Sequence, residues 1–217
     1  FELYDIDRVE IVKGPQATLF GTAASVGALS VITAKPQQEL AGQIKVSAGN
    51  FSARTAQGFI TGGNDKIQGR FAFNYRERDG FIDNIAGDPG SQSAGGIAQD
   101  DMHGIERTAF RPSLRITPND DLTIDLVYSY EKNDDTGTSF KNRNFAPTGG
   151  NTSPFSFVEM SGSPLSQQVL GKEKLGVERR VDDFNMTVEY HLNDTMTLTS
   201  VSGFREFESL EVFDADG

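Results

Sequence analysis

The sequence predicts a mainly β protein: part of a transmembrane antiparallel β-barrel of about seven strands that follows a compact β module. Three observations lead to this fold class. Segments of about ten residues alternate apolar and polar side chains, and their connections alternate between short turns and long loops. In addition, charged side chains stand in the middle of the polar faces.

The β module comprises residues 6–36, and it begins with a strand. Val9 and Ile11 are two positions apart, and Arg8 and Glu10 occupy the alternate positions. This spacing is typical of a half-buried strand, with an apolar face and a polar face.

A tight turn and a small-residue loop follow that strand. The Gly14-Pro15 pair ends it, because proline fixes φ and has no amide donor. Residues 16–20 are expected to form one helical turn, and Gly21 and Gly27 give the next loop backbone freedom. Residues 28–33 then form a second strand.

After residue 37 the pattern changes to long alternating segments, which we interpret as seven strands. Short turns are expected at residues 62–65, 118–121 and 192–195, and long loops at residues 79–103 and 133–176. The strands themselves are expected at residues 42–49, 54–62, 66–78, 107–117, 122–131, 181–191 and 196–208.

The repeat alone fits a soluble β-sandwich as well as a barrel, and the polar faces favour the barrel. Charges in the middle of a strand need water or partners, as a hydrated or plugged lumen provides, whereas the opposite, apolar face suits lipid. Those charges are Arg70, Arg76, Arg107, Arg111, Arg115, Asp125 and Glu189.

Composition limits the function further. The 217 residues carry a net charge of −11, which argues against a nucleic-acid partner, and they include no cysteine. No run of 18 apolar residues is present, so no transmembrane helix is expected. Residues 1–3 do not resemble a signal peptide, and we expect the native protein to begin further upstream.

The β module also carries three ordered motif blocks. They are Arg8-Val9-Glu10-Ile11-Val12-Lys13-Gly14-Pro15, then Leu19-Phe20-Gly21, then Gly27-Ala28-Leu29-Ser30-Val31-Ile32-Thr33. Together they resemble the end of the plug domain of TonB-dependent outer-membrane receptors. Val26, Ser30 and Ala34 depart from the family pattern and bear on local loop detail.

The resemblance implies the domain organisation. Residues 1–36 would be the C-terminal part of an α/β plug domain, and residues 37–217 the N-terminal portion of a receptor β-barrel. Because members of this family have a 22-stranded barrel with a plugged lumen, the chain is expected to be a fragment.

The resemblance also implies a function and partners. Such receptors sit in the Gram-negative outer membrane and take up scarce, large nutrients, powered by a TonB-type protein that binds a region not found in this sequence. A ferric siderophore is the expected substrate; cobalamin, haem and oligosaccharides are alternatives. The competing interpretation is a surface β protein without transport, such as an adhesin or a ligand-binding module.

Two sets of candidate site residues follow. In the plug motif (Arg8, Glu10, Lys13, Gly14, Pro15, Gly21 and Gly27), the charged members are candidates for a latch that pairs with the barrel wall. In the loop at residues 133–176, exposed aromatic and cationic side chains are candidates for ligand contact; the alternative is that they only pack the loop onto its neighbours. These are Phe140, Arg143, Phe145, Phe155 and Phe157.

No catalytic, cofactor or metal site is predicted. Adjacent aspartates such as Asp182-Asp183 point to opposite faces of a strand, so they do not form a two-carboxylate acid/base site. The histidines, His103 and His191, are expected at opposite ends of the barrel, too far apart to share a metal ion. The sequence also contains no nucleophile–base–orienter set, which argues against a hydrolase.

Overall fold

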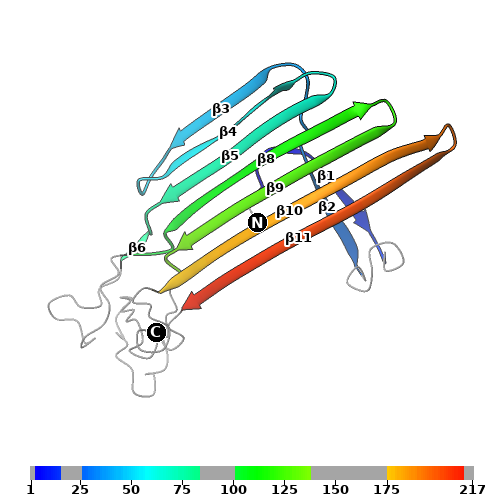
Figure 1. Cartoon of the computed structure of the whole chain (residues 1–217). Coiled ribbons are helices and arrows are strands. Elements are labelled where there is room, and N and C mark those ends of the chain that lie inside the picture. The colour runs from blue at the N-terminus through cyan, green and yellow to red at the C-terminus, as the bar shows by residue number, and fades with distance from the viewer. Residues whose placement is uncertain (1–2, 16–25, 84–100, 138–174, 213–217) are drawn as a thin grey trace, which may run out of the picture.

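A large antiparallel sheet dominates the fold (Figure 1). The computed structural model describes residues 3–15, 26–83, 101–137 and 175–212. Seven strands form this sheet, in the spatial order β11-β10-β9-β8-β5-β4-β3. Their bounds are β3 Ala41–Ala48, β4 Arg54–Gly63, β5 Ile67–Arg78, β8 Ile105–Asn119, β9 Leu122–Asp135, β10 Gly176–Asn193 and β11 Met196–Val212.

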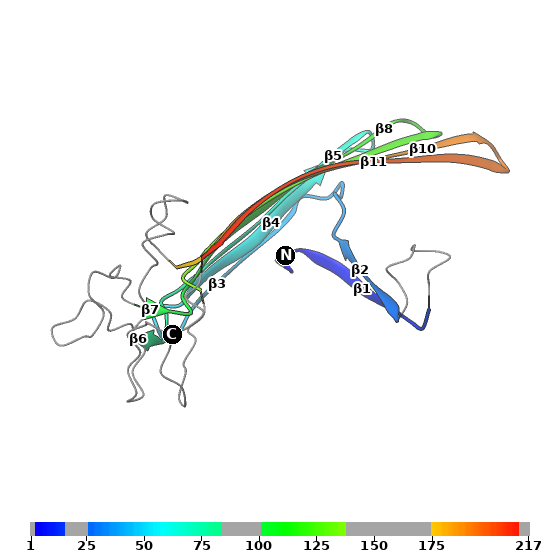
Figure 2. The ribbon, with the colours of Figure 1, turned by 90° about the horizontal axis from the view of Figure 1, so that it is seen from below.

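Four further strands lie outside this sheet. β1 (Ile6–Lys13) and β2 (Gly27–Thr33) pair with each other as an antiparallel hairpin. Figure 2 shows this hairpin on the concave side of the curved sheet. β6 (Ile82–Asp83) and β7 (Asp101–Met102) form a small pair at the end of the sheet opposite the β10–β11 turn.

The seven predicted strands are confirmed, and the structure lengthens several of them. β10 begins at Gly176 instead of residue 181, and β11 ends at Val212 instead of residue 208. Near these strand ends, charged residues occupy positions of the apolar face: Glu178 and Arg180 on β10, and Glu206 and Glu208 on β11. Periodicity alone therefore ends the segments too early. The predicted helical turn at residues 16–20 lies outside the described residues.

The two faces of the sheet differ in chemistry, which separates a barrel from a sandwich. The outer, convex face carries large apolar side chains that are exposed to solvent: Ile44 and Val46 on β3, Ile60 on β4, Phe71 on β5, Phe184 on β10 and Phe204 on β11. In a sandwich, a second sheet would bury such a face. Among the described residues nothing covers it, as expected for a wall that faces lipid.

The inner, concave face carries charged side chains that pair across neighbouring strands. Arg115 on β8 donates two hydrogen bonds of 2.7 Å to the carboxylate of Asp125 on β9. Arg205 on β11 donates one of 2.9 Å to Asp183 on β10. These pairs satisfy charges that would be costly on a surface facing lipid.

One prediction for the hairpin is wrong. The alternation in β1 predicted a half-buried strand, but the side chains of Val9 and Ile11 are 48% and 69% exposed. Among the described residues, the hairpin pairs only with itself, and it meets the sheet through residues 4 and 5, which precede β1. Strand periodicity records a face that can be buried, but not what buries it.

Candidate functional site

A buried ion pair joins the hairpin to the inner face of the sheet. Asp5 directly precedes β1, and Arg70 lies in the middle of β5, 65 residues later. Nε of Arg70 donates to Oδ2 of Asp5 at 2.8 Å, and Nη2 donates to Oδ1. The Arg70 and Asp5 side chains are only 5% and 6% exposed. This is the two-pronged geometry in which arginine binds a carboxylate most strongly.

An aromatic ring covers the Arg70 guanidinium. Its central carbon lies 3.8 Å from the centre of the Phe59 ring, close enough for a cation–π interaction. Phe59 packs against a small buried cluster of Tyr4, Ala72 and Ala109. The charge is therefore held between a carboxylate and an aromatic ring, away from bulk water.

A second arginine holds the same end of the hairpin. Arg111 on β8 donates from Nη1 to the backbone carbonyl of Tyr4 at 3.2 Å, and its guanidinium carbon lies 4.5 Å from the Tyr4 ring centre. Nε of Arg111 donates to Oγ of Ser129 on β9 at 3.3 Å, which fixes the guanidinium plane. Two adjacent strands of the wall thus hold Tyr4 and Asp5.

The backbone at this contact is constrained. Asp5 has φ of 51°, in the left-handed region that residues other than glycine seldom adopt. In that conformation its carbonyl accepts a hydrogen bond of 3.0 Å from the Ala34 amide, which closes the base of the hairpin. The ion pair therefore holds both strands of the hairpin at once.

Burial raises the pKa of the Tyr4 phenol to about 12. The undocked phenol ionises near pH 10, whereas the docked phenol keeps its proton to higher pH. Docking is therefore expected to weaken as the pH rises from 10 to 12, with no contribution from this group below pH 10. The measurement is protease protection of the hairpin against pH in the full-length protein. Tyr4→Phe should remove this part of the pH dependence, and an unchanged profile would contradict the assignment.

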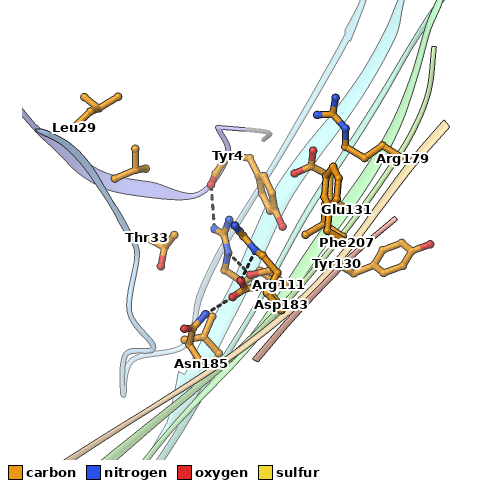
Figure 3. Close-up of a pocket in the computed structure, with 15 residues that line it drawn as sticks. Tyr4, Leu29, Thr33, Arg111, Tyr130, Glu131, Arg179, Asp183, Asn185 and Phe207 are labelled. Carbon is orange, nitrogen blue, oxygen red and sulfur yellow. Dashed lines mark hydrogen bonds and ion pairs between the residues drawn. The ribbon is translucent and has the colours of Figure 1, made fainter. Parts of the chain in front are cut away.

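A cavity of about 780 Å³ lies between the hairpin and the wall (Figure 3). Leu29 and Val31 of β2 line its hairpin side, and Phe207 of β11 lies on its wall side. Five charged residues also line the cavity: Arg111, Arg179, Arg205, Glu131 and Asp183. Such a space can hold water or admit a polar molecule, and it leaves the hairpin attached mainly at one end.

The structure places the charged plug-motif residues away from the wall. Arg8 donates hydrogen bonds of 2.7 Å to Glu10 and to Asp7 on its own strand. These bonds, the one to Glu10 above all, raise the pKa of the exposed Arg8. Lys13 is exposed at the far end of β1. The contact with the wall is made by Tyr4 and Asp5, which sequence reasoning had not singled out.

The glycines of the motif have identifiable roles where they are described. Gly14, followed by Pro15, has φ of 89°, a conformation that favours glycine. At Gly27, a Cβ atom would lie 2.6 Å from the Val12 carbonyl oxygen, so only glycine lets the two strands approach this closely. Gly21 lies outside the described residues, as do the ligand-contact candidates Phe140, Arg143, Phe145, Phe155 and Phe157.

The histidines lie apart, as expected. Nδ1 of His191 is 2.9 Å from Oγ1 of Thr197 beside the β10–β11 turn, whereas His103 follows β7 at the other end of the sheet. In the part of the chain that the structure describes, no group of three or more histidine, cysteine or acidic side chains could hold a metal ion. In the same residues, no helix is long and apolar enough to cross a membrane.

Comparison with known proteins identifies similar chains. No protein-family model matches the sequence. It is 26% identical over 137 residues to the ferrioxamine B receptor of Salmonella typhimurium, covering 62% of this chain and 17% of that protein. It is 35% identical over 83 residues to the vitamin B12 transporter BtuB of Vibrio vulnificus, covering 35% and 13% of the two proteins.

The fold is also similar to that of solved receptors. The ferric yersiniabactin uptake receptor FyuA of Yersinia pestis superposes with a TM-score of 0.74 at 20% identity, over 98% of this chain and 30% of that chain. The chain thus spans less than a third of this structure and less than a fifth of the two curated relatives.

Proposed function

The chain is a segment of a TonB-dependent receptor of the Gram-negative outer membrane, and on this premise we propose that the full-length protein takes up a ferric siderophore. It binds the substrate on the outside and admits it when the plug moves, without covalent chemistry. The observation that carries the proposal is the buried Asp5–Arg70 pair, which attaches a hairpin to the polar face of a sheet whose other face is apolar.

We assign residues 1–36 to the end of the plug domain and residues 37–217 to the first part of the barrel wall. Two features support this boundary. β2 ends at Thr33 and pairs only with β1, whereas β3 begins at Ala41 and pairs into the seven-stranded sheet.

The attachment suits a gate. A buried ion pair adds little net stability, but separating its partners leaves an uncompensated charge in a dry site. The plug therefore stays docked at rest, and a pull from a TonB-type protein of the inner membrane supplies the work of separation. Arg8, Glu10 and Lys13 are proposed to contribute to the latch by meeting parts of the receptor beyond this chain.

The substrates named for the relatives support a ferric siderophore but do not determine the substrate of this protein. The relatives include a receptor for ferrioxamine B, an uptake receptor for ferric yersiniabactin and a transporter for vitamin B12. Two of these three substrates are iron chelates, so a ferric siderophore is our first choice, and cobalamin is the main alternative.

Deleting the full-length gene is expected to abolish uptake of at least one ferric siderophore. The measurement is accumulation of radiolabelled iron from a panel of chelates, with cobalamin, haem and oligosaccharides run in parallel. A strain that lacks TonB should show the same loss, and the restored gene should reverse it. If iron uptake is unchanged and cobalamin uptake is lost, cobalamin is the substrate instead of a siderophore. If all uptake is intact and adhesion is lost, the protein is an adhesin.

A further inference from the structure

Four side chains form a cluster at the end of the sheet near β6 and β7, which we name the rim cluster: Phe51, Arg78, Phe81 and His103. Phe51 lies in the turn between β3 and β4, Phe81 directly before β6, and His103 directly after β7. The rings of Phe81 and His103 stack with their centres 5.0 Å apart and their planes 21° from parallel. The Phe51 ring centre lies 6.2 Å from that of Phe81.

The rim cluster exposes aromatic surface. Phe51 and Phe81 are 54% and 49% exposed. Phe51, Ser52 and His103 also have φ of 58°, 52° and 66°, a region unfavourable for side chains of this kind. Strained backbone that presents exposed rings is more typical of a binding surface than of a structural cap.

Hydrogen bonds hold the strained segments in place. The Asp79 amide donates to the Phe51 carbonyl at 2.9 Å, and the Phe81 amide donates to the Met102 carbonyl at 3.2 Å. The His103 amide donates to the Gly137 carbonyl at 2.9 Å. The rings are therefore presented on a fixed frame built from three separate parts of the chain.

Arg78 places the cluster on the lumen side of the rim. It lies eight positions after Arg70 on β5, so both side chains point to the inner face. Its guanidinium carbon is 5.1 Å from the centre of the Phe81 ring, and Nη2 donates to the His103 carbonyl at 2.5 Å. Its Nε is buried and has no hydrogen-bond acceptor among the described residues. The positive charge of the guanidinium thus lies beside the exposed ring of Phe81.

We propose that the rim cluster is a subsite for an aromatic, anionic iron chelate, of the catecholate or phenolate class. Its rings stack on Phe51 and Phe81, and its charged oxygens face the guanidinium of Arg78. This inference rests on the proposed uptake function and specifies the substrate class. Chelates without aromatic rings gain nothing from the stacking, so the cluster discriminates between substrate classes.

The test uses the full-length receptor in outer-membrane preparations and measures binding of radiolabelled ferric tris-catecholate and ferric tris-hydroxamate. The Phe51→Ala/Phe81→Ala variant is expected to weaken tris-catecholate binding by between about fivefold and a hundredfold, since each aromatic contact contributes modestly. Binding of the tris-hydroxamate should stay as in the wild type. Phe81→Tyr keeps a ring and should retain most of the affinity for the tris-catecholate.

The matched control is Phe71→Ala, which removes a 44% exposed ring from the outer face of β5 and should leave both affinities unchanged. Equal affinities of the Phe51→Ala/Phe81→Ala variant and the wild type for the tris-catecholate would overturn the subsite. So would an equal loss for both chelates, or weaker membrane insertion of the variant in place of weaker binding. A wild-type receptor that binds neither chelate overturns the siderophore function itself.

Discussion

Replacing Arg70 with glutamate is expected to release the hairpin from the wall and leave the full-length receptor leaky. The variant places two carboxylates against each other where both native side chains are at most 6% exposed. Removing one partner of a buried ion pair costs roughly 3–5 kcal/mol, and reversing its charge adds repulsion. The neighbouring Arg111–Tyr4 contact is also buried but is not an ion pair, so the Asp5–Arg70 pair is where a reversed charge acts most directly on the hairpin.

Sensitivity of whole cells to a large glycopeptide antibiotic measures this leak, because displacement of the proposed plug would open the lumen. The matched control is Arg115→Glu, which breaks the Arg115–Asp125 pair within the wall and leaves the hairpin untouched. That pair is about a quarter exposed, so a smaller effect without leakage is expected. The double variant Asp5→Arg/Arg70→Asp should restore part of the barrier. Equal antibiotic resistance in the Arg70→Glu and wild-type strains would show that the pair does not hold the plug.

Leu126→Arg is expected to impair assembly of the receptor in the membrane. Leu126 lies mid-strand on the outer face of β9, opposite Leu114 on β8 and Met186 on β10. An arginine near the middle of the bilayer on the lipid face of a barrel costs about 2–4 kcal/mol. The folded fraction, read from heat-modifiable gel mobility of the full-length protein, should fall accordingly.

The neighbouring position provides the control. Val127 lines the cavity on the inner face, so Val127→Arg places the same side chain in a polar space that already holds three arginines. Its folded fraction should stay near that of the wild type. If the two variants assemble equally well, the outer face of the sheet does not meet lipid.

Most of the sheet could be predicted from the sequence, because period-two alternation and turn residues act locally. The β8–β9 pair illustrates this: Leu122 and the four alternate apolar residues after it marked the strand, and the preceding turn marked its start. The strand ends were missed where charges replace the apolar residues. At those ends, the distance of a residue from the lipid decides whether its side chain is apolar or charged. A local sequence pattern does not record that distance.

Of the candidate site, only the residues on the sheet were predictable from the sequence. Arg70 and Arg111 were recognisable as charges in the middle of strands that needed partners. Their partners, Asp5 and Tyr4, lie 65 and 107 residues away, in a segment without periodicity. Arg8 and Glu10 stood within the recognisable motif, yet they pair with each other. Proximity across such separations comes from the tertiary fold.

The length of the last two strands sets the height of the wall. β10 has 18 residues, which span about 59 Å at roughly 3.3 Å per residue. At a tilt of about 40°, this corresponds to a rise of about 45 Å, against a hydrocarbon layer of about 30 Å. About 15 Å of wall therefore overhangs the bilayer, where the outer face carries Arg180 and Glu208 in register. The rim stands clear of the lipid, within reach of antibodies and other macromolecules that never touch the membrane.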